Sequence, residues 1–235
     1  MRRISSAIKA ALTASVALLG SPAGAQVRPT EHQALTERDA PKLRIERHLE
    51  TLGGDRLRVQ WQGERPTVIT GLSVSVKGST PLEQAADFLD VHEVLTAGTT
   101  LVPVEANTRR ERTVVRLAQH HQRLPVLDHE GTLTLDDQGH VIAFHNAAEP
   151  LQSFKQATIT EDDARTLALR YVLGEGPVSP EASAPKVTRG VAAVGNFGVE
   201  VFEVEVVRQP MVAHFVVRVD GHSGRVIGLR NRVIR

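Results

Sequence analysis

The chain has 235 residues, a formal net charge of +1 and no cysteine. The lack of cysteine excludes disulfides and thiolate chemistry, and the interspersed acidic and basic residues exclude the single-sign stripe typical of nucleic-acid or membrane-surface binding. Aromatic residues make up only 3% of the chain, while Val, Leu and Ala are plentiful, which favours a strand-rich fold with short helices.

The N-terminus predicts export. Basic residues precede an apolar run from Ala10 to Leu19, and small residues lead up to Ala25. This order is typical of a secretory signal peptide cleaved after Ala25, and the run is too short for a membrane span, which needs about 20 apolar residues. We expect a periplasmic or secreted protein that has no membrane segment once residues 1–25 are removed.

A polar lead-in and a hairpin follow the signal peptide. Residues 26–55 are charged and poorly periodic, with one short amphipathic helix expected near residues 42–52. Apolar and polar residues then alternate over residues 56–62 and 67–77, on either side of a turn at residues 63–66. Because the side chains of a strand point alternately to its two faces, this period of two predicts two half-buried strands that pair.

A helix is predicted to begin at Pro81 and to end near Gly98. Thr80 is suited to the N-cap, Pro81 to the first helical position, and Glu83 stands where a capping box needs its carboxylate. The apolar stripe expected to face the core consists of Leu82, Ala85, Ala86 and Leu89.

Strands and a second helix follow. Alternating segments cover residues 99–106, 113–122, 125–136 and 140–147, and the short breaks between the last three predict antiparallel neighbours. Thr160 and Asp163 then provide a weaker capping box for a second helix. Its predicted apolar stripe consists of Ala164, Leu167, Ala168, Tyr171 and Val172.

The end of the chain alternates again. A loop rich in Gly and Pro covers residues 174–185, and breaks at residues 196–198, 209–210 and 220–224 separate the strand segments that follow it. A helix followed by antiparallel strands therefore occurs twice. This order predicts an α+β fold with two lobes, each a helix packed on an antiparallel β-sheet.

The stretch from His120 to Gly131 contains three histidines, an Asp and a Glu, which makes it the first candidate for a metal or acid–base site. Neighbouring strand residues point to opposite faces, so His120 and His121 cannot bind one ion without a bulge, and His129 brings no third ligand with it. The pattern favours polar residues of exposed or edge strands over a metal site.

No other motif predicts catalysis. His92 and Glu93 begin like the zinc-protease motif H-E-x-x-H, but Thr96 stands in place of the second histidine. Ser153 and His145 lack a nucleophile elbow, the glycines at 190, 195 and 198 do not join a strand to a helix, and the acids at 161–163 suit the dipole of a helix start. We expect no catalytic residue, no cofactor and no bound metal.

Two stretches carry a resemblance to a known family. The first, VRLAQHHQRLPVLDHEGTLTLDDQGHV from Val115 to Val141, resembles the fingerprint of the propeptides that precede thermolysin- and fungalysin-type zinc metalloproteases, the FTP domain. Downstream, ITEDDARTLALRYVL and FVVRVDGHSGRVIG resemble the PepSY module that follows it. The matching positions are Arg116, Gln119, Leu124, Pro125, Val126, Glu130, Leu135, Asp136, Gly139, Val141, Asp220 and Gly224.

The resemblance implies a domain division and a role for these positions. It implies an FTP-like lobe over residues 56–150 and a PepSY-like lobe over residues 157–235, both of cystatin-like or PepSY-like fold, with the matching residues acting in structure. Arg123 and Asp128 stand where the family has glycines. Asp tolerates left-handed backbone fairly well and Arg less so, so the resemblance does not predict the geometry of this turn.

The resemblance also implies a function. It implies a noncatalytic protein that binds a zinc metalloprotease as a folding chaperone, an inhibitor or both, in cis within a longer precursor or in trans; no peptidase domain stands between the PepSY-like segment and Arg235. The alternative is an exported binding module of the same fold whose sheet face or edge takes an unrelated peptide or envelope partner.

Overall fold

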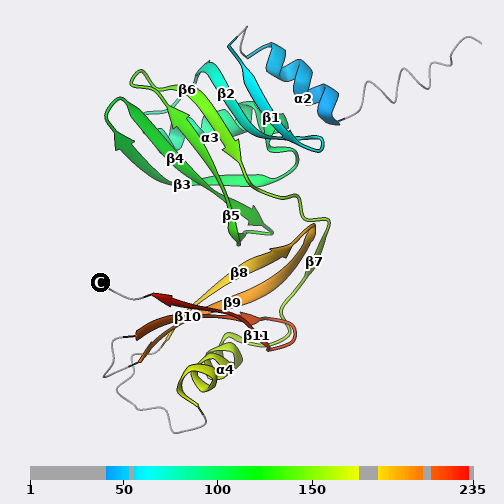
Figure 1. The fold of residues 1–235 in the computed structure, drawn as a ribbon, viewed down its shortest axis with the longest axis vertical. Helices are drawn as coiled ribbons and strands as arrows, with labels where there is room; N and C mark the ends of the chain where they lie inside the picture. The colour runs from blue at the N-terminus through cyan, green and yellow to red at the C-terminus, as the bar shows by residue number, and fades with distance from the viewer. Residues whose placement is uncertain (1–40, 53–55, 175–184, 209–212, 233–235) are drawn as a thin grey trace, which may run out of the picture.

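The structure, a computed structural model, describes residues 41–52, 56–174, 185–208 and 213–232. Figure 1 shows the arrangement of these residues. The predicted signal peptide, most of the lead-in, the loop at 175–184 and the break at 209–210 lie outside the described residues. No described helix is long and apolar enough to cross a membrane.

The helices and strands follow the sequence periodicity. The helices are α2 (Pro41–Glu50), α3 (Pro81–Val91), the short 3-10 helix η1 (Glu93–Thr96) and α4 (Glu161–Leu173). The strands are β1 (Arg58–Gln62), β2 (Arg65–Ser75), β3 (Thr100–Arg109), β4 (Arg112–His121), β5 (Leu124–Leu135), β6 (His140–Asn146), β7 (Ser153–Lys155), β8 (Lys186–Val194), β9 (Phe197–Arg208), β10 (Ala213–Asp220) and β11 (Val226–Arg232). The helix expected near residues 42–52 is confirmed as α2; η1 and the three-residue β7 were not predicted.

The predicted fold class is wrong. The described strands do not form two separate lobes of cystatin-like or PepSY-like type, each with its own helix on its own antiparallel sheet; they form a single mixed sheet of 11 strands with few helices. Antiparallel neighbours run in the order β1-β2-β6-β5-β4-β3 in one part and β8-β9-β10-β11 in the other. Two parallel pairings, β5 with β8 and β7 with β9, make the sheet mixed.

The joint between the two parts of the sheet lies inside β5. Residues Val126 and Leu127 leave the register with β4 and pair in parallel with Val191 and Ala192 of β8. Asp128 then takes a left-handed φ of 64°, and its carboxylate accepts hydrogen bonds from the guanidinium groups of Arg218 (2.9 Å) and Arg230 (3.2 Å). Periodicity identified β5 as a strand but carries no information on which distant strand it would meet, so the joint was missed.

Helix α3 begins as the sequence predicts. The Thr80 hydroxyl accepts from the Glu83 backbone N–H (3.3 Å) and the Glu83 carboxylate accepts from the Thr80 N–H (3.2 Å), which completes the capping box. The predicted stripe is only partly right: Ala85 and Leu89 are buried, but Leu82 and Ala86 are exposed. The buried face is centred on Phe88, whose ring packs against that of Phe144 at 5.7 Å between centroids.

Helix α4 shows the same agreement and a similar error. Thr160 and Asp163 form a complete capping box, and Ala164 and Ala168 are fully buried against the sheet. Tyr171, however, is 57% exposed although it belongs to the predicted stripe. A phenol tolerates such a position because its polar end is hydrated.

Two hydrophobic clusters stabilise the sheet. The first cluster lies between α3 and strands β2 to β6 and contains large side chains such as Phe88, Phe144, Leu117 and Leu133. The second cluster lies between α4 and strands β9 and β10 and contains Ala164, Ala168, Phe202, Val204, Val206, Val217 and Val219.

Candidate functional site

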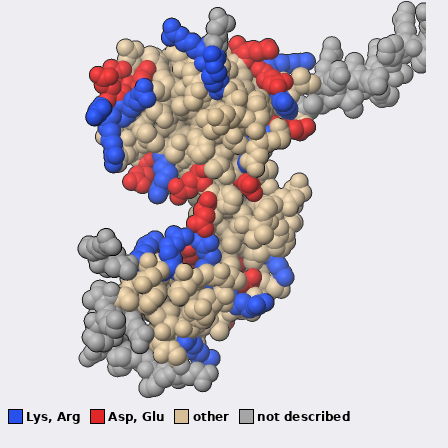
Figure 2. Space-filling model, in the orientation of Figure 1, with Lys and Arg blue, Asp and Glu red and all other residues tan. Residues whose placement is uncertain are grey.

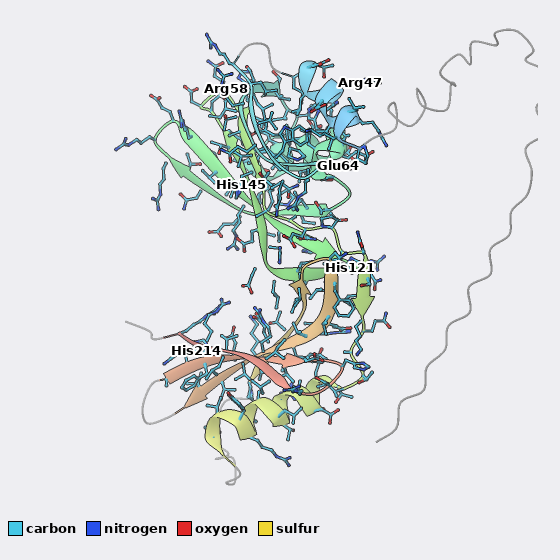
Figure 3. All side chains as sticks on the ribbon, turned by 45° about the vertical axis from the view of Figure 1, so that its right-hand side comes forward. Arg47, Arg58, Glu64, His121, His145 and His214 are labelled. Atoms are coloured by element: carbon cyan, nitrogen blue, oxygen red, sulfur yellow. The ribbon has the colours of Figure 1, made fainter. Side chains whose placement is uncertain are left out.

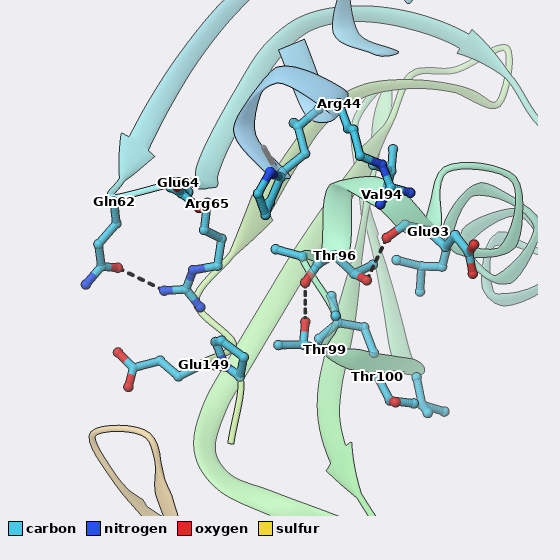
Figure 4. Close-up of a pocket in the computed structure, with 18 of the residues that line it drawn as sticks. Arg44, Gln62, Glu64, Arg65, Glu93, Val94, Thr96, Thr99, Thr100 and Glu149 are labelled. Atoms are coloured by element: carbon cyan, nitrogen blue, oxygen red, sulfur yellow. Dashed lines mark hydrogen bonds between the residues drawn. The ribbon is translucent and has the colours of Figure 1, made fainter. Parts of the chain in front are cut away.

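A groove with a volume of about 1290 Å³ lies beside the start of β3. Its walls come from α2, the turn between β1 and β2, the ends of α3 and η1, and the first residues of β3. Glu149, Pro150, Gln152 and Asn196 complete the lining. Figure 4 shows Arg44, Arg65 and Glu149 around this groove. Stretches far apart in the sequence therefore form one site.

A tight chain reversal between η1 and β3 forms one wall of the groove. The Thr96 hydroxyl donates to the Glu93 carbonyl (2.8 Å), and the Thr99 hydroxyl donates to the Thr96 carbonyl (2.6 Å). Ala97 and Gly98 both adopt positive φ, 51° and 80°, which turns the chain back within two residues. The small and hydroxylated residues of this stretch suit such a turn, and it sets the start of β3 against the groove.

Gln119 holds the opposite wall in place. Its buried side-chain amide donates to the Glu149 carbonyl (2.6 Å) and accepts from the Glu149 backbone N–H (3.0 Å). Further along, the Asn196 carbonyl accepts from the Gln152 backbone N–H (2.8 Å). The backbone of Glu149 is therefore fixed on both sides, and its carboxylate lines the groove.

The groove lining carries an excess of acidic side chains. Its charged residues are the carboxylates Glu64, Asp90, Glu93 and Glu149 and the guanidinium groups of Arg44 and Arg65, so four negative and two positive charges leave a formal charge of −2. Among the described residues, none of the four carboxylates is in an ion pair. The Arg65 guanidinium donates to the Gln62 side chain (2.9 Å), and its buried Nη1 has no partner among the described atoms.

A pair of histidines lies behind the α2 wall. His48 Nε2 and His92 Nδ1 are 2.9 Å apart, and the His92 ring also packs on that of Phe88. Burial lowers the pKa of His48. Burial also lowers the pKa of His92, and the neighbouring His48 lowers it further, against an opposing effect of Asp87. These shifts disfavour the charged form of both rings, and a neutral ring can donate to the other.

The matching residues of the family fingerprint lie apart from the groove, except for the backbone contact of Gln119. Arg116 and Glu130 project from the same face of β4 and β5, 3.8 Å apart, and Arg116 also approaches Glu105 (3.4 Å). Pro125 and the buried Val126 belong to the joint with β8. These contacts act within the sheet and do not converge on one point.

Two fingerprint pairs form similar turns. Asp136 Oδ1 accepts from the backbone N–H groups of Gln138 (3.0 Å) and His140 (2.8 Å), before Gly139 at φ 80°. Burial alone would raise the pKa of Asp136, but the hydrogen bonds outweigh it and the pKa is lowered.

The second turn, between β10 and β11, is also closed by an aspartate side chain. Asp220 Oδ1 accepts from the backbone N–H groups of His222 and Ser223, both at 2.8 Å, before Gly224 at φ 70°. Burial alone would raise the pKa of Asp220, and the two N–H donors lower it overall. In each turn the aspartate carboxylate accepts hydrogen bonds from backbone N–H groups. The glycine adopts the left-handed backbone conformation that the turn needs.

The histidine-rich stretch spans the joint of the sheet. The turn residues Gln122 and Arg123 have φ of 49° and 70°, so Arg123, like Asp128, is left-handed where the family has glycine. His121 packs its ring on Phe154 at 5.0 Å, and His129 lies 3.4 Å from the Ala147 carbonyl. Figure 3 shows His121 at the joint, well separated from His145 and His214. In the described part of the chain, no three His, Asp or Glu side chains are placed to hold a metal ion.

The remaining motif candidates pack, cap a helix or lie beside the groove. A Cβ at Gly190 would lie 2.9 Å from the Leu127 side chain, and one at Gly198 would lie 2.9 Å from that of Leu151, so both glycines permit close packing. Asp163 caps α4, and hydrogen bonds from the Thr160 backbone and side chain lower its pKa. Glu93 lines the groove, while its neighbour His92 is buried against His48.

The residues of the groove were not predicted as a site. Asp90 lies outside the predicted apolar stripe of its helix, Glu93 enters only as part of an incomplete zinc-protease motif, and Glu64 and Arg65 are assigned to a turn. No short motif joins them, because they come from separate elements that only the fold brings together. The one available signal was two acidic residues, Asp90 and Glu93, three positions apart within a predicted helix, which is too common to indicate a site.

No protein family model matches this chain, and no curated protein matches it. Among solved structures, the Bacillus megaterium YpeB C-terminal domain is 13% identical, with a TM-score of 0.42 over 74% of this chain and 75% of that one. A candidate lipoprotein from Clostridium difficile 630 is 10% identical, with a TM-score of 0.25 over 63% of this chain and 92% of that one. Similarities of this size assign neither a fold family nor a function.

Proposed function

We propose that this chain is an exported, noncatalytic protein that binds a thermolysin-type zinc metalloprotease, in cis within a longer precursor or in trans, as a folding chaperone, an inhibitor or both. The observation that carries the proposal is the structural role of the fingerprint residues. Gln119 fixes the chain at Glu149, and Asp136 with Gly139 and Asp220 with Gly224 form turns. The residues shared with the propeptides thus support a rigid scaffold.

Such a scaffold can act on a protease without chemistry of its own. A protease that folds slowly through intermediates is open to kinetic traps, and a folded partner that binds its native surface stabilises the product by mass action. The predicted signal peptide would place the chain in the same compartment as secreted proteases. An exposed sheet whose turns are fixed by side-chain hydrogen bonds changes little on binding, which limits the entropic cost of association.

The test is a titration of the chain lacking residues 1–25 against a thermolysin-type protease, ideally from the same organism. Saturable inhibition of the mature protease, or a higher yield of active protease after dilution from denaturant, is the expected result. A secreted serine protease treated identically is the control for nonspecific effects. A folded chain that changes neither activity nor refolding yield at concentrations of about 10 µM would exclude this function, because a complex with a Kd of about 1 µM would be roughly 90% formed at that concentration.

A second candidate is an exported binding module with an unrelated peptide or envelope partner. The groove beside β3 is the specific observation that favours it, because ligand sites are concave and carry a few convergent polar groups. A pull-down from the exported fraction that recovers a partner other than a metalloprotease, together with a negative protease titration, would establish this alternative.

A further inference from the structure

We propose that the groove beside β3 binds an extended, positively charged segment of a partner protein. The segment adds to the edge of β3 through backbone hydrogen bonds and places Lys or Arg side chains against the groove carboxylates. The inference goes beyond protease binding, because it concerns a site remote from most of the fingerprint residues.

The backbone part of the site is the edge of β3. Within the described residues β3 pairs with β4 alone, so its other edge has unpaired N–H and C=O groups. The stretch from Thr99 to Val102 lines the groove. Pro103 follows, which has no N–H to donate, and the register shifts by one residue just beyond it.

The short length of the open β3 edge limits the kind of ligand that can pair with it. An open edge is a template for another strand, and proline and bulges restrict such pairing in native proteins. The proline and the register shift therefore leave room for a few residues of an added strand and oppose a long one. A short extended peptide fits these limits better than the edge of another whole sheet does.

The charge of the lining selects the sign of the ligand. Glu64, Asp90, Glu93 and Glu149 outnumber Arg44 and Arg65, and no described cation neutralises any of the four carboxylates by an ion pair. A ligand with Lys or Arg at alternate positions would place these side chains on the same face of the added strand. Charge complementarity of this kind accelerates binding and rejects partners of like charge.

The charge also distinguishes this ligand from the chain's own lead-in. Residues 26–40 run directly into Pro41, which lines the groove, so they are the nearest alternative occupant. Their sequence, QVRPTEHQALTERDA, has two arginines against two glutamates and one aspartate, so its side chains carry no net positive charge. Such a segment matches the acidic groove less well than a basic partner does.

The experiment presents the chain lacking residues 1–25 with an immobilised library of random decapeptides. The expected result is enrichment of peptides that contain Lys or Arg at alternate positions. The best binder is then measured in solution by fluorescence anisotropy against the unchanged chain, a groove variant and a matched control.

The groove variant is Asp90→Asn with Glu93→Gln, and the control is Glu111→Gln with Asp137→Asn. All four positions are exposed, and the two variants change the net charge equally, but Glu111 and Asp137 lie in turns outside the groove. We expect the groove variant to weaken binding about tenfold at low salt and the control to change it by less than about twofold. Circular dichroism establishes that both variants remain folded.

Four results would overturn the proposal: a library without basic enrichment, equal affinity of the groove variant and the unchanged chain, binding that is seen only after residues 26–40 are removed, or a concentration-dependent dimer that the groove variant loses. The third result would identify the lead-in as the occupant, and the fourth would identify a second copy. Protease inhibition by the groove variant is measured in parallel, so that loss of peptide binding with inhibition retained separates this site from the protease-binding surface.

Discussion

The two hydrophobic clusters differ in the size of their side chains. The buried residues of the first cluster include Phe, Leu and Ile, among them Phe88 and Phe144, whereas those of the second are Ala and Val with one ring, Phe202, against which the partly buried Phe215 packs. Because burial stabilises roughly in proportion to apolar area, the first cluster contributes more to the folded state. The second part of the sheet therefore depends more on its joint with β5.

The joint itself is polar on its exposed side. Asp128 lies between Arg218 and Arg230, and Arg218 is also hydrogen-bonded to Glu203 (2.8 Å). Figure 2 shows acidic and basic side chains next to each other at the hollow between the two parts of the molecule. The apolar contact of Val126 with its neighbours and this charge network together hold the two parts.

The largest change in stability is expected for substitutions inside the two clusters. Phe88→Ala should lower the free energy of unfolding by about 3–5 kcal/mol, and Val204→Ala by about 2 kcal/mol, because the first removes a whole ring and the second two methyl groups. Urea unfolding measures both changes. Equal losses for the two variants would show that the clusters contribute equally and would remove the basis of the comparison.

Hydrogen exchange compares the local stability of the two clusters. In the unchanged chain, amides of β9 and β10 should exchange faster than those of β4 and β5, because the region with the smaller cluster opens locally more often. Val204→Ala should accelerate exchange in β9 and β10 while the amides of β4 and β5 keep their protection.

A smaller loss of stability is expected at the turn that contains Gly139. Gly139→Val should lower stability by about 2 kcal/mol, since a φ of 80° is costly for any L-residue and more so for a β-branched one. His121→Ala, the control, loses the contact with Phe154 and should cost only about 1 kcal/mol. Thermal unfolding of both variants decides: a Gly139 variant as stable as the unchanged chain would contradict the structural role of this turn.

The smallest expected change is in how the stability of the chain depends on pH through Asp128 at the joint. The hydrogen bond from Arg218, against the opposing effect of burial, lowers the pKa of Asp128 below 3.8. A lowered folded-state pKa stabilises fully above pH ~5, and the contribution is lost as the pH falls through 3.8 towards the folded-state value. Since the carboxylate is 56% exposed, the contribution should be below about 1 kcal/mol.

Asp128→Asn tests this effect, because Asn tolerates the same left-handed backbone but has no charge. Stability at pH 7 should fall slightly, and the loss of stability between pH 5 and 3 should be smaller than in the unchanged chain, as urea unfolding at each pH will measure. Asp137→Asn, in an exposed turn, serves as the control. An unchanged pH profile for the Asp128 variant would mean that the ion pairs do not stabilise the joint.

The sequence predicted the elements better than their assembly. Thr80 with Glu83 and Thr160 with Asp163 located two helix starts, because capping is local chemistry within four residues. Alternation located the strands in the same way. The parallel pairing of Val126 with Val191 joins residues far apart in the chain, and no local pattern encodes it, so the predicted pair of separate lobes was wrong. The groove escaped prediction for the same reason.

The turn of β5 at Asp128 gives one strand two sets of neighbours. If β8 detaches, the backbone groups of Val126 and Leu127 become an open edge. A second molecule carries an identical β8, which would fit that edge in the same register. The residues that hold the monomer together are thus also the place where two molecules would exchange strands, so domain swapping is the form of self-association that this fold favours under partly denaturing conditions.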